Sequence, residues 1–115
     1  MRNLLIIIIL LSLSSMLLSA PGDLIWKYKT DSYVDSSPYI SVGIVFVGSY
    51  DRYLYAINSS NGSLKWRYGT YGFFYSSPCV SDGVVYIGSY DDYLYAINCS
   101  NGIFIWRYRT VNEIY

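Results

Sequence analysis

Few residues in this chain could carry acid–base or metal chemistry. It contains no His, the side chain most often used for proton transfer near neutral pH and for binding metals. Asp51, Asp91 and Asp92 occur in two equivalent turns, where an acidic cluster could hold calcium. One or two acids without further oxygen ligands more often accept hydrogen bonds from the backbone of their own turn. We therefore expect no catalytic residue and no metal site.

The tryptophans form a more informative pattern. The 3 Trp lie forty residues apart, each four positions after a glycine, and an alanine precedes two of them by ten positions. A Trp can stack on a peptide plane of a neighbouring unit, and a glycine permits a tight turn with positive φ. Identical spacing in every copy favours a structural role over a row of ligand-binding aromatics. The predicted structural motif consists of Trp26, Trp66, Trp106, Gly62, Gly102, Ala56 and Ala96.

The repeat that positions these residues predicts an all-β fold. Asp23–Gly62 aligns with Ser63–Gly102 without a gap, and more than half of the positions are identical. A period near forty without a helical pattern is typical of a four-stranded β-propeller blade. The expected strands are Ser37–Ser41, Ile44–Ser49, Tyr53–Asn58 and Ser63–Tyr68 in blade one, and Ser77–Ser81, Val84–Ser89, Tyr93–Asn98 and Ile103–Tyr108 in blade two.

A lone copy of the outermost strand, Leu24–Lys29, precedes the two blades. The predicted fold class is therefore an incomplete β-propeller, with two four-stranded antiparallel blades plus one orphan outer strand. A closed propeller has about four to eight blades. The open flanks predict a truncated longer protein, a ring of several copies, or a partner that caps the ends. The expected divisions are residues 1–20 (signal peptide or membrane anchor), 22–110 (repeats, with strand 24–29, blade one 36–68 and blade two 76–108) and 111–115 (a tail or the start of a missing blade).

The two cysteines fall on strands that are not neighbours. Cys79 belongs to the inner strand of blade two and Cys99 ends its third strand. Their Cα atoms should lie roughly 10 Å apart, from a spacing of about 4.8 Å between strands, which exceeds the reach of a disulfide. We expect two free cysteines.

The segment Ala56–Trp66, repeated as Ala96–Trp106, resembles the tryptophan-docking motif of the PQQ-type β-propeller repeat family. That family runs Ala-x-Asp-x-x-Thr-Gly-Lys-x-x-Trp. Asn58 stands where the family has Asp, and Asn61 stands where it has Thr, so each position keeps a hydrogen-bonding side chain. The resemblance covers nearly everything after residue 22.

The resemblance implies one of two functions. Quinone-dependent dehydrogenases of this family carry a calcium site, a catalytic Asp and, in many members, adjacent cysteines, none of which is recognisable here. Other members, such as the propeller lipoprotein that assists outer-membrane protein assembly, are not enzymes and bind proteins. The chain is more similar to the second group, which implies a protein-binding scaffold without enzyme activity or cofactor, as a fragment of a larger propeller. The alternative is a non-catalytic fragment of a PQQ-dependent dehydrogenase.

The connection between the two blades is the predicted partner-binding loop. It is aromatic and should lie on a propeller face beside the turn at residues 50–53. Exposed aromatics favour partner binding, whereas Phe73 and Phe74 would be structural if they packed under the next blade. The chain has 8 Lys and Arg against 8 Asp and Glu, so charge gives no case for nucleic acid. The expected partner is a protein or further copies of the chain, and the loop comprises Tyr71, Phe73, Phe74 and Tyr75.

The N-terminal segment has the order of a secretory signal. Arg2 precedes an uncharged run from Asn3 to Gly22, and small residues end the apolar part. The apolar stretch, residues 4–18, is short for a membrane span of roughly 20 residues. A cleaved signal is therefore favoured over an uncleaved anchor or a plain buried segment. The expected location is secreted, periplasmic or at the cell surface, with membrane contact only through this segment.

Overall fold

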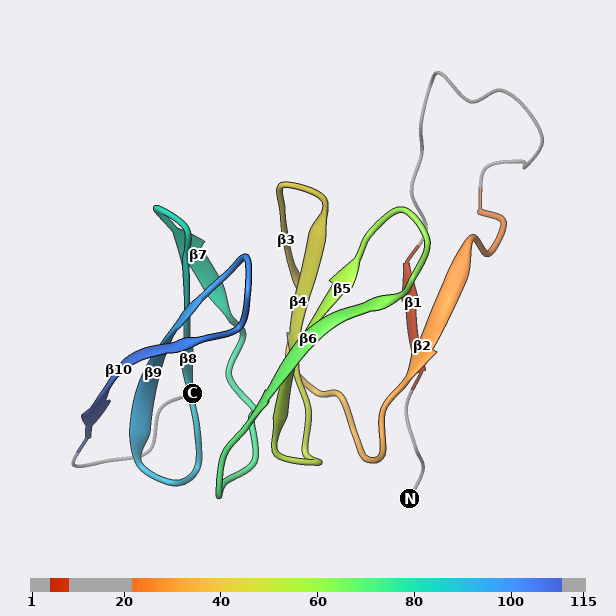
Figure 1. Ribbon diagram of the computed structural model, residues 1–115. Coiled ribbons are helices and arrows are strands. Elements are labelled where there is room, and N and C mark those ends of the chain that lie inside the picture. Colours follow the sequence, from red (N-terminus) through yellow and green to blue (C-terminus); the bar gives the residue numbers. More distant parts are fainter. Residues whose placement is uncertain (1–4, 9–21, 111–115) are drawn as a thin grey trace.

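The computed structural model describes residues 5–8 and 22–110, and every regular element within them is a β-strand (Figure 1). Two four-stranded antiparallel sheets stand side by side, and each is one blade. The predicted all-β fold with two blades is therefore confirmed. Blade one contains β3 (Tyr39–Ser41), β4 (Ile44–Gly48), β5 (Tyr53–Asn58) and β6 (Leu64–Gly69), and blade two contains β7 (Cys79–Ser81), β8 (Val84–Gly88), β9 (Tyr93–Asn98) and β10 (Phe104–Arg109).

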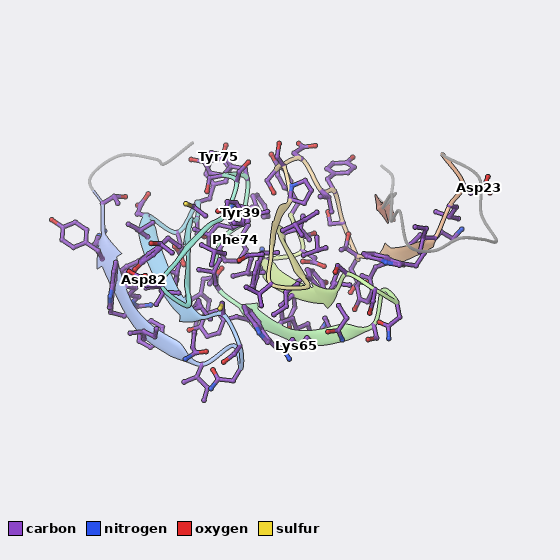
Figure 2. The ribbon with its side chains drawn as sticks, turned by 90° about the horizontal axis from the view of Figure 1, so that it is seen from above. Asp23, Tyr39, Lys65, Phe74, Tyr75 and Asp82 are labelled. Carbon is purple, nitrogen blue, oxygen red and sulfur yellow. The ribbon has the colours of Figure 1, made fainter. Side chains whose placement is uncertain are left out.

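Each blade runs from an inner to an outer strand in chain order, and the two blades share one register. Phe46 lies opposite Ala56 in blade one, as Tyr86 lies opposite Ala96 in blade two. Strand β4 is buried along its whole length, because sheets cover both of its faces, and this explains its continuous apolar run. The outer strands carry alternating basic residues instead, and Figure 2 shows Lys65 of β6 on this outer rim.

The hydrophobic core lies in layers between neighbouring sheets, not inside any one sheet. Successive residues of a strand point to opposite faces, so Phe46 packs toward blade two while Val45 packs toward the N-terminal strand. The layer between the blades contains Ile44, Phe46, Leu54, Ala56, Trp66, Phe74, Val85, Ile87, Tyr95 and Ile97. The layer between blade one and the N-terminal strand contains Trp26, Val45, Val47, Tyr55 and Ile57.

The orphan strand β2 (Trp26–Lys29) lies outside both four-stranded sheets and begins two residues later than predicted. It pairs antiparallel with β1 (Leu5–Ile8). The pairing sets Ile8 opposite Trp26, the same register that sets Ala56 opposite Trp66 in blade one. Along β2, β1 therefore takes the place that the third strand takes within a blade.

Only residues 5–8 of the predicted signal or anchor are described, as β1. The rest of that segment, and residues 111–115, lie outside the described residues. Export therefore stays a prediction. No helix among the described residues is long and apolar enough to cross a membrane.

Candidate functional site

Trp66 packs across the gap between the blades onto a glycine of blade two. Its indole Nε1 donates a hydrogen bond to the carbonyl oxygen of Cys99 at 3.0 Å. The ring lies over Gly102, where an added Cβ would stand 2.6 Å from Cδ2 of Trp66. Gly102 also has a φ of 75°. The turn therefore requires glycine for its conformation and for the space that the ring fills.

Trp26 makes the same contact one blade earlier. Its Nε1 donates to the carbonyl oxygen of Ser59 at 2.7 Å, and its ring lies over Gly62, again 2.6 Å from the position of an added Cβ. Ala56 of the motif is completely buried on the other face of blade one, in the layer that contains Trp66. Two successive interfaces, β2 with blade one and blade one with blade two, are thus joined by one repeated contact.

Trp106 has no blade to pack against within the described residues. It is 42% exposed, compared with 8% for Trp26 and 9% for Trp66. Tyr108 is likewise 67% exposed, although its counterpart Tyr68 is partly buried against blade two. The sequence predicted one role for all three tryptophans, and the structure separates them because only Trp26 and Trp66 have a neighbouring blade among the described residues. We call the surface formed by Tyr86, Trp106 and Tyr108 the open flank.

The aspartates in the turns organise the turns themselves. Oδ1 of Asp51 accepts a hydrogen bond from the backbone N–H of Tyr53 at 3.0 Å, and its Oδ2 accepts one from the Tyr55 hydroxyl. Burial, and then this bond, raise the pKa of Tyr55 above its usual value. Asp91 makes the equivalent bonds in blade two. The turn-stabilising role that the sequence favoured over calcium is therefore the one observed, and no group of three metal-ligating side chains occurs among residues 22–110.

An Arg completes this network, and sequence reasoning missed it. The guanidinium of Arg67 lies 4.1 Å from the ring centroid of Tyr53, and that of Arg107 lies 4.0 Å from the ring of Tyr93. The alternation of the outer strand was visible, but it predicted only a charged face. The forty-residue recurrence of Asp, Tyr and Arg was the signal that could have revealed the network.

The predicted partner-binding loop divides into surface and core. Tyr71 is 88% exposed and Phe73 is 39% exposed, whereas Phe74 is completely buried. Phe74 forms a β-bridge with Ser89, and an added Cβ on Gly48 would lie 2.6 Å from its Cβ. Including Phe74 among the partner-binding residues was therefore wrong, because its ring fills the layer between the blades. Both free cysteines are as expected, Cys79 exposed and Cys99 half-buried.

Phe73 belongs to a continuous row of aromatic rings that sequence reasoning did not assemble. Tyr50 stacks on Phe73 with ring centroids 5.2 Å apart and planes within 6°. Tyr33 meets Tyr50 edge-on at 5.9 Å, Phe73 meets Tyr90 at 6.0 Å, and Tyr90 lies 3.8 Å from Tyr75. Burial raises the pKa of Tyr50, and nearby Asp35 raises it further by charge and hydrogen bonding. We call Tyr33, Tyr50, Phe73, Tyr90 and Tyr75 the aromatic row.

Removing the indole of a motif tryptophan should lower the free energy of unfolding strongly only where that indole packs against a neighbouring blade. Trp66→Ala should lower the free energy of unfolding by about 3–5 kcal/mol, because it empties a filled interface. Trp106→Ala, the same change at the equivalent position of blade two, should cost less than about 1 kcal/mol. Urea unfolding of both variants measures the difference. Equal losses would show that the contact between blades contributes nothing beyond the burial within each strand.

Comparisons with known proteins agree with this geometry. A family model described as outer membrane protein assembly factor BamB matches residues 15–114. A search of curated proteins finds no match. BamB from Moraxella catarrhalis has a similar structure, with a TM-score of 0.71 and 17% sequence identity, over 80% of this chain and 29% of that one.

Two dehydrogenases share the fold as well. A europium-containing methanol dehydrogenase gives a TM-score of 0.70 at 16% identity, over 77% of this chain and 19% of that chain. The quinohemoprotein alcohol dehydrogenase ADHIIG from Pseudomonas putida HK5 gives a TM-score of 0.73 at 28% identity, over 79% of this chain and 17% of that chain. The chain thus spans less than a third of each of these structures. With the repeat, the docked tryptophans and the family match together, the chain belongs to the PQQ-like β-propeller repeat family whose model is described as outer membrane protein assembly factor BamB.

Proposed function

We propose that this chain is an exported or membrane-tethered propeller module that acts as a protein-binding scaffold, without catalysis of its own, as part of a larger propeller. The observation that carries the proposal is the open flank of blade two. Trp106 and Tyr108 expose large apolar surfaces at positions where blade one buries or partly buries its equivalents. A contiguous exposed patch of this kind marks a surface that another protein segment covers.

The small share of each similar structure that this chain covers supports the same proposal. The chain corresponds to 29% of the length of the Moraxella BamB structure and to smaller shares of the two dehydrogenases. Propellers close with about four to eight blades, so two blades leave flanks that need partners. The partner is a set of further blades or another copy of the chain, and the exposed residues Tyr71 and Phe73 offer a second surface for protein binding.

Sedimentation velocity of the full-length chain tests the role of the open flank. The wild-type protein should associate as its concentration rises, because association buries Trp106. Trp106→Lys should reduce this association, since a buried unpaired ammonium is costly. Val42→Lys serves as the matched control, because Val42 is 92% exposed and lies in the turn between β3 and β4, away from both of these surfaces. A monodisperse wild-type monomer, or equal association of wild type and Trp106→Lys, would refute the proposal.

A fragment of a quinone-dependent dehydrogenase is the second candidate, favoured by the 28% identity to the Pseudomonas alcohol dehydrogenase. The two functions differ in a simple assay. We expect the purified chain not to oxidise alcohols or sugars when pyrroloquinoline quinone and calcium are added, because the sequence contains no recognisable catalytic Asp or pair of adjacent cysteines. Turnover that depends on the added quinone would favour the dehydrogenase.

A further inference from the structure

Four loops lie together at one end of the two blades. The connection after β2, the turns β4–β5 and β8–β9, and the connection β6–β7 all lie at the lower ends of the strands in Figure 1. Backbone hydrogen bonds tie them to one another: Tyr50 N–H donates to the Tyr33 carbonyl at 2.8 Å, and Tyr90 N–H to the Phe73 carbonyl at 3.0 Å. We call residues 30–36, 50–52, 70–76 and 90–92 the loop face.

The aromatic row crosses this loop face from one blade to the next. Its contacts join residues of all four loops without a break, from Tyr33 to Tyr75. Phe73 and Tyr90, in the middle of the row, are 39% and 37% exposed. The row is therefore an ordered strip of rings whose backbone positions are fixed by hydrogen bonds between the loops.

Charge is separated between this face and the outer strands. Five of the 8 acidic residues lie on the loop face, whereas six of the 8 basic residues lie on β2, β6 and β10. The loop face thus carries an excess of acidic residues, although the side chains of Arg67 and Arg107 reach the Asp51 and Asp91 networks at its edge. The five acids are Asp31, Asp35, Asp51, Asp91 and Asp92.

Arg52, the single basic residue of the loop face, shows that a guanidinium group can pack on the aromatic row. The guanidinium of Arg52 lies 5.7 Å from the centroid of Phe73, within the range of a cation–π contact. Arg52 also borders a surface hollow lined by Asp51, Tyr68 and Tyr71. An Arg side chain therefore already rests on the row, with carboxylate and phenol groups beside it.

We propose that the loop face binds an extended, arginine-rich segment of a partner protein. Guanidinium groups stack on aromatic rings and pair with carboxylates, and the loop face carries both kinds of group. Acidic surfaces repel nucleic acid and anionic membranes, so the same charges disfavour those ligands. This proposal rests on the proposed scaffold function and names the chemistry of its partner.

Titration of the full-length chain with synthetic peptides tests the proposal. The probes are a Gly-Ser peptide carrying three Arg, the same peptide with citrulline in place of Arg, and the same peptide with Glu. The Arg peptide should bind, more weakly as salt is added, and the other two should bind at least about tenfold more weakly, because they lose charge pairing and cation–π contact. Equal binding of the Arg and citrulline peptides, or no binding of either, would overturn the proposal.

Paired variants locate the site. Phe73→Leu removes a ring but keeps apolar volume, and Asp35→Asn with Asp92→Asn removes charge without touching the Asp51 and Asp91 turn networks. Each change should lower the affinity for the Arg peptide by about tenfold and leave the melting temperature unchanged. Asp82→Asn, on an exposed hairpin at the other end of the blade, should leave binding unchanged. If Asp82→Asn weakens binding as much, the peptide is attracted by the negative charges of the whole protein and does not bind specifically at the loop face.

The open flank gives an independent readout. Trp106→Lys should bind the Arg peptide like the wild type, because Trp106 lies outside the loop face. If Trp106→Lys abolishes association while peptide binding persists, both proposals hold. If association persists in that variant and the peptide still binds, the scaffold proposal fails at the flank and the loop-face proposal stands.

Discussion

The contact of an indole ring with a bare glycine is the constraint on which this structure depends. Each blade is a sheet with two apolar faces, and apolar packing alone is not directional, so it does not fix how one sheet is turned against the next. The Trp66 ring occupies the position where a Cβ of Gly102 would stand, and its Nε1 bonds to the Cys99 carbonyl. Distance and rotation between the sheets are therefore set together. The same pair of contacts at Trp26 sets the preceding interface.

The positions of the strands and turns could be predicted from the sequence because the same residue pattern occurs in both blades. The strands differ from the expected positions by at most two residues, since apolar runs and turn residues recur in step. The positive φ of Gly62 and Gly102 was also expected from the turn, and both values are near 75°. What the repeat could not show is where the repetition ends. Trp106 shares the run Trp-Arg-Tyr with Trp66, yet it is exposed because the described residues contain no further blade for it to pack against.

The surface was harder to predict for a different physical reason. Phe73 and Phe74 are adjacent and of the same type, yet one is 39% exposed and the other is fully buried. In an irregular connection, no sequence period tells which side chains face the core. Only the structure shows the bridge from Phe74 to Ser89 that buries Phe74. The aromatic row joins residues of four separate loops, from Tyr33 to Tyr90, so the sequence of any one loop could not predict it. Pairing of β1 with β2 was likewise invisible in a segment that reads as a signal.

The two glycines beneath the indoles allow the central contact to be measured directly. In proton NMR of the folded chain, the Hα atoms of Gly62 and Gly102 should be shifted strongly upfield by the ring currents of Trp26 and Trp66. Gly43 and Gly83, which have a similar positive φ but nothing near the position of an added Cβ, serve as references and should show ordinary shifts. Trp66→Leu should return the Gly102 signal alone to the reference value. If all four glycines show ordinary shifts in the wild-type protein, the rings do not rest on the turns, and the docked tryptophan is not what orders the blades.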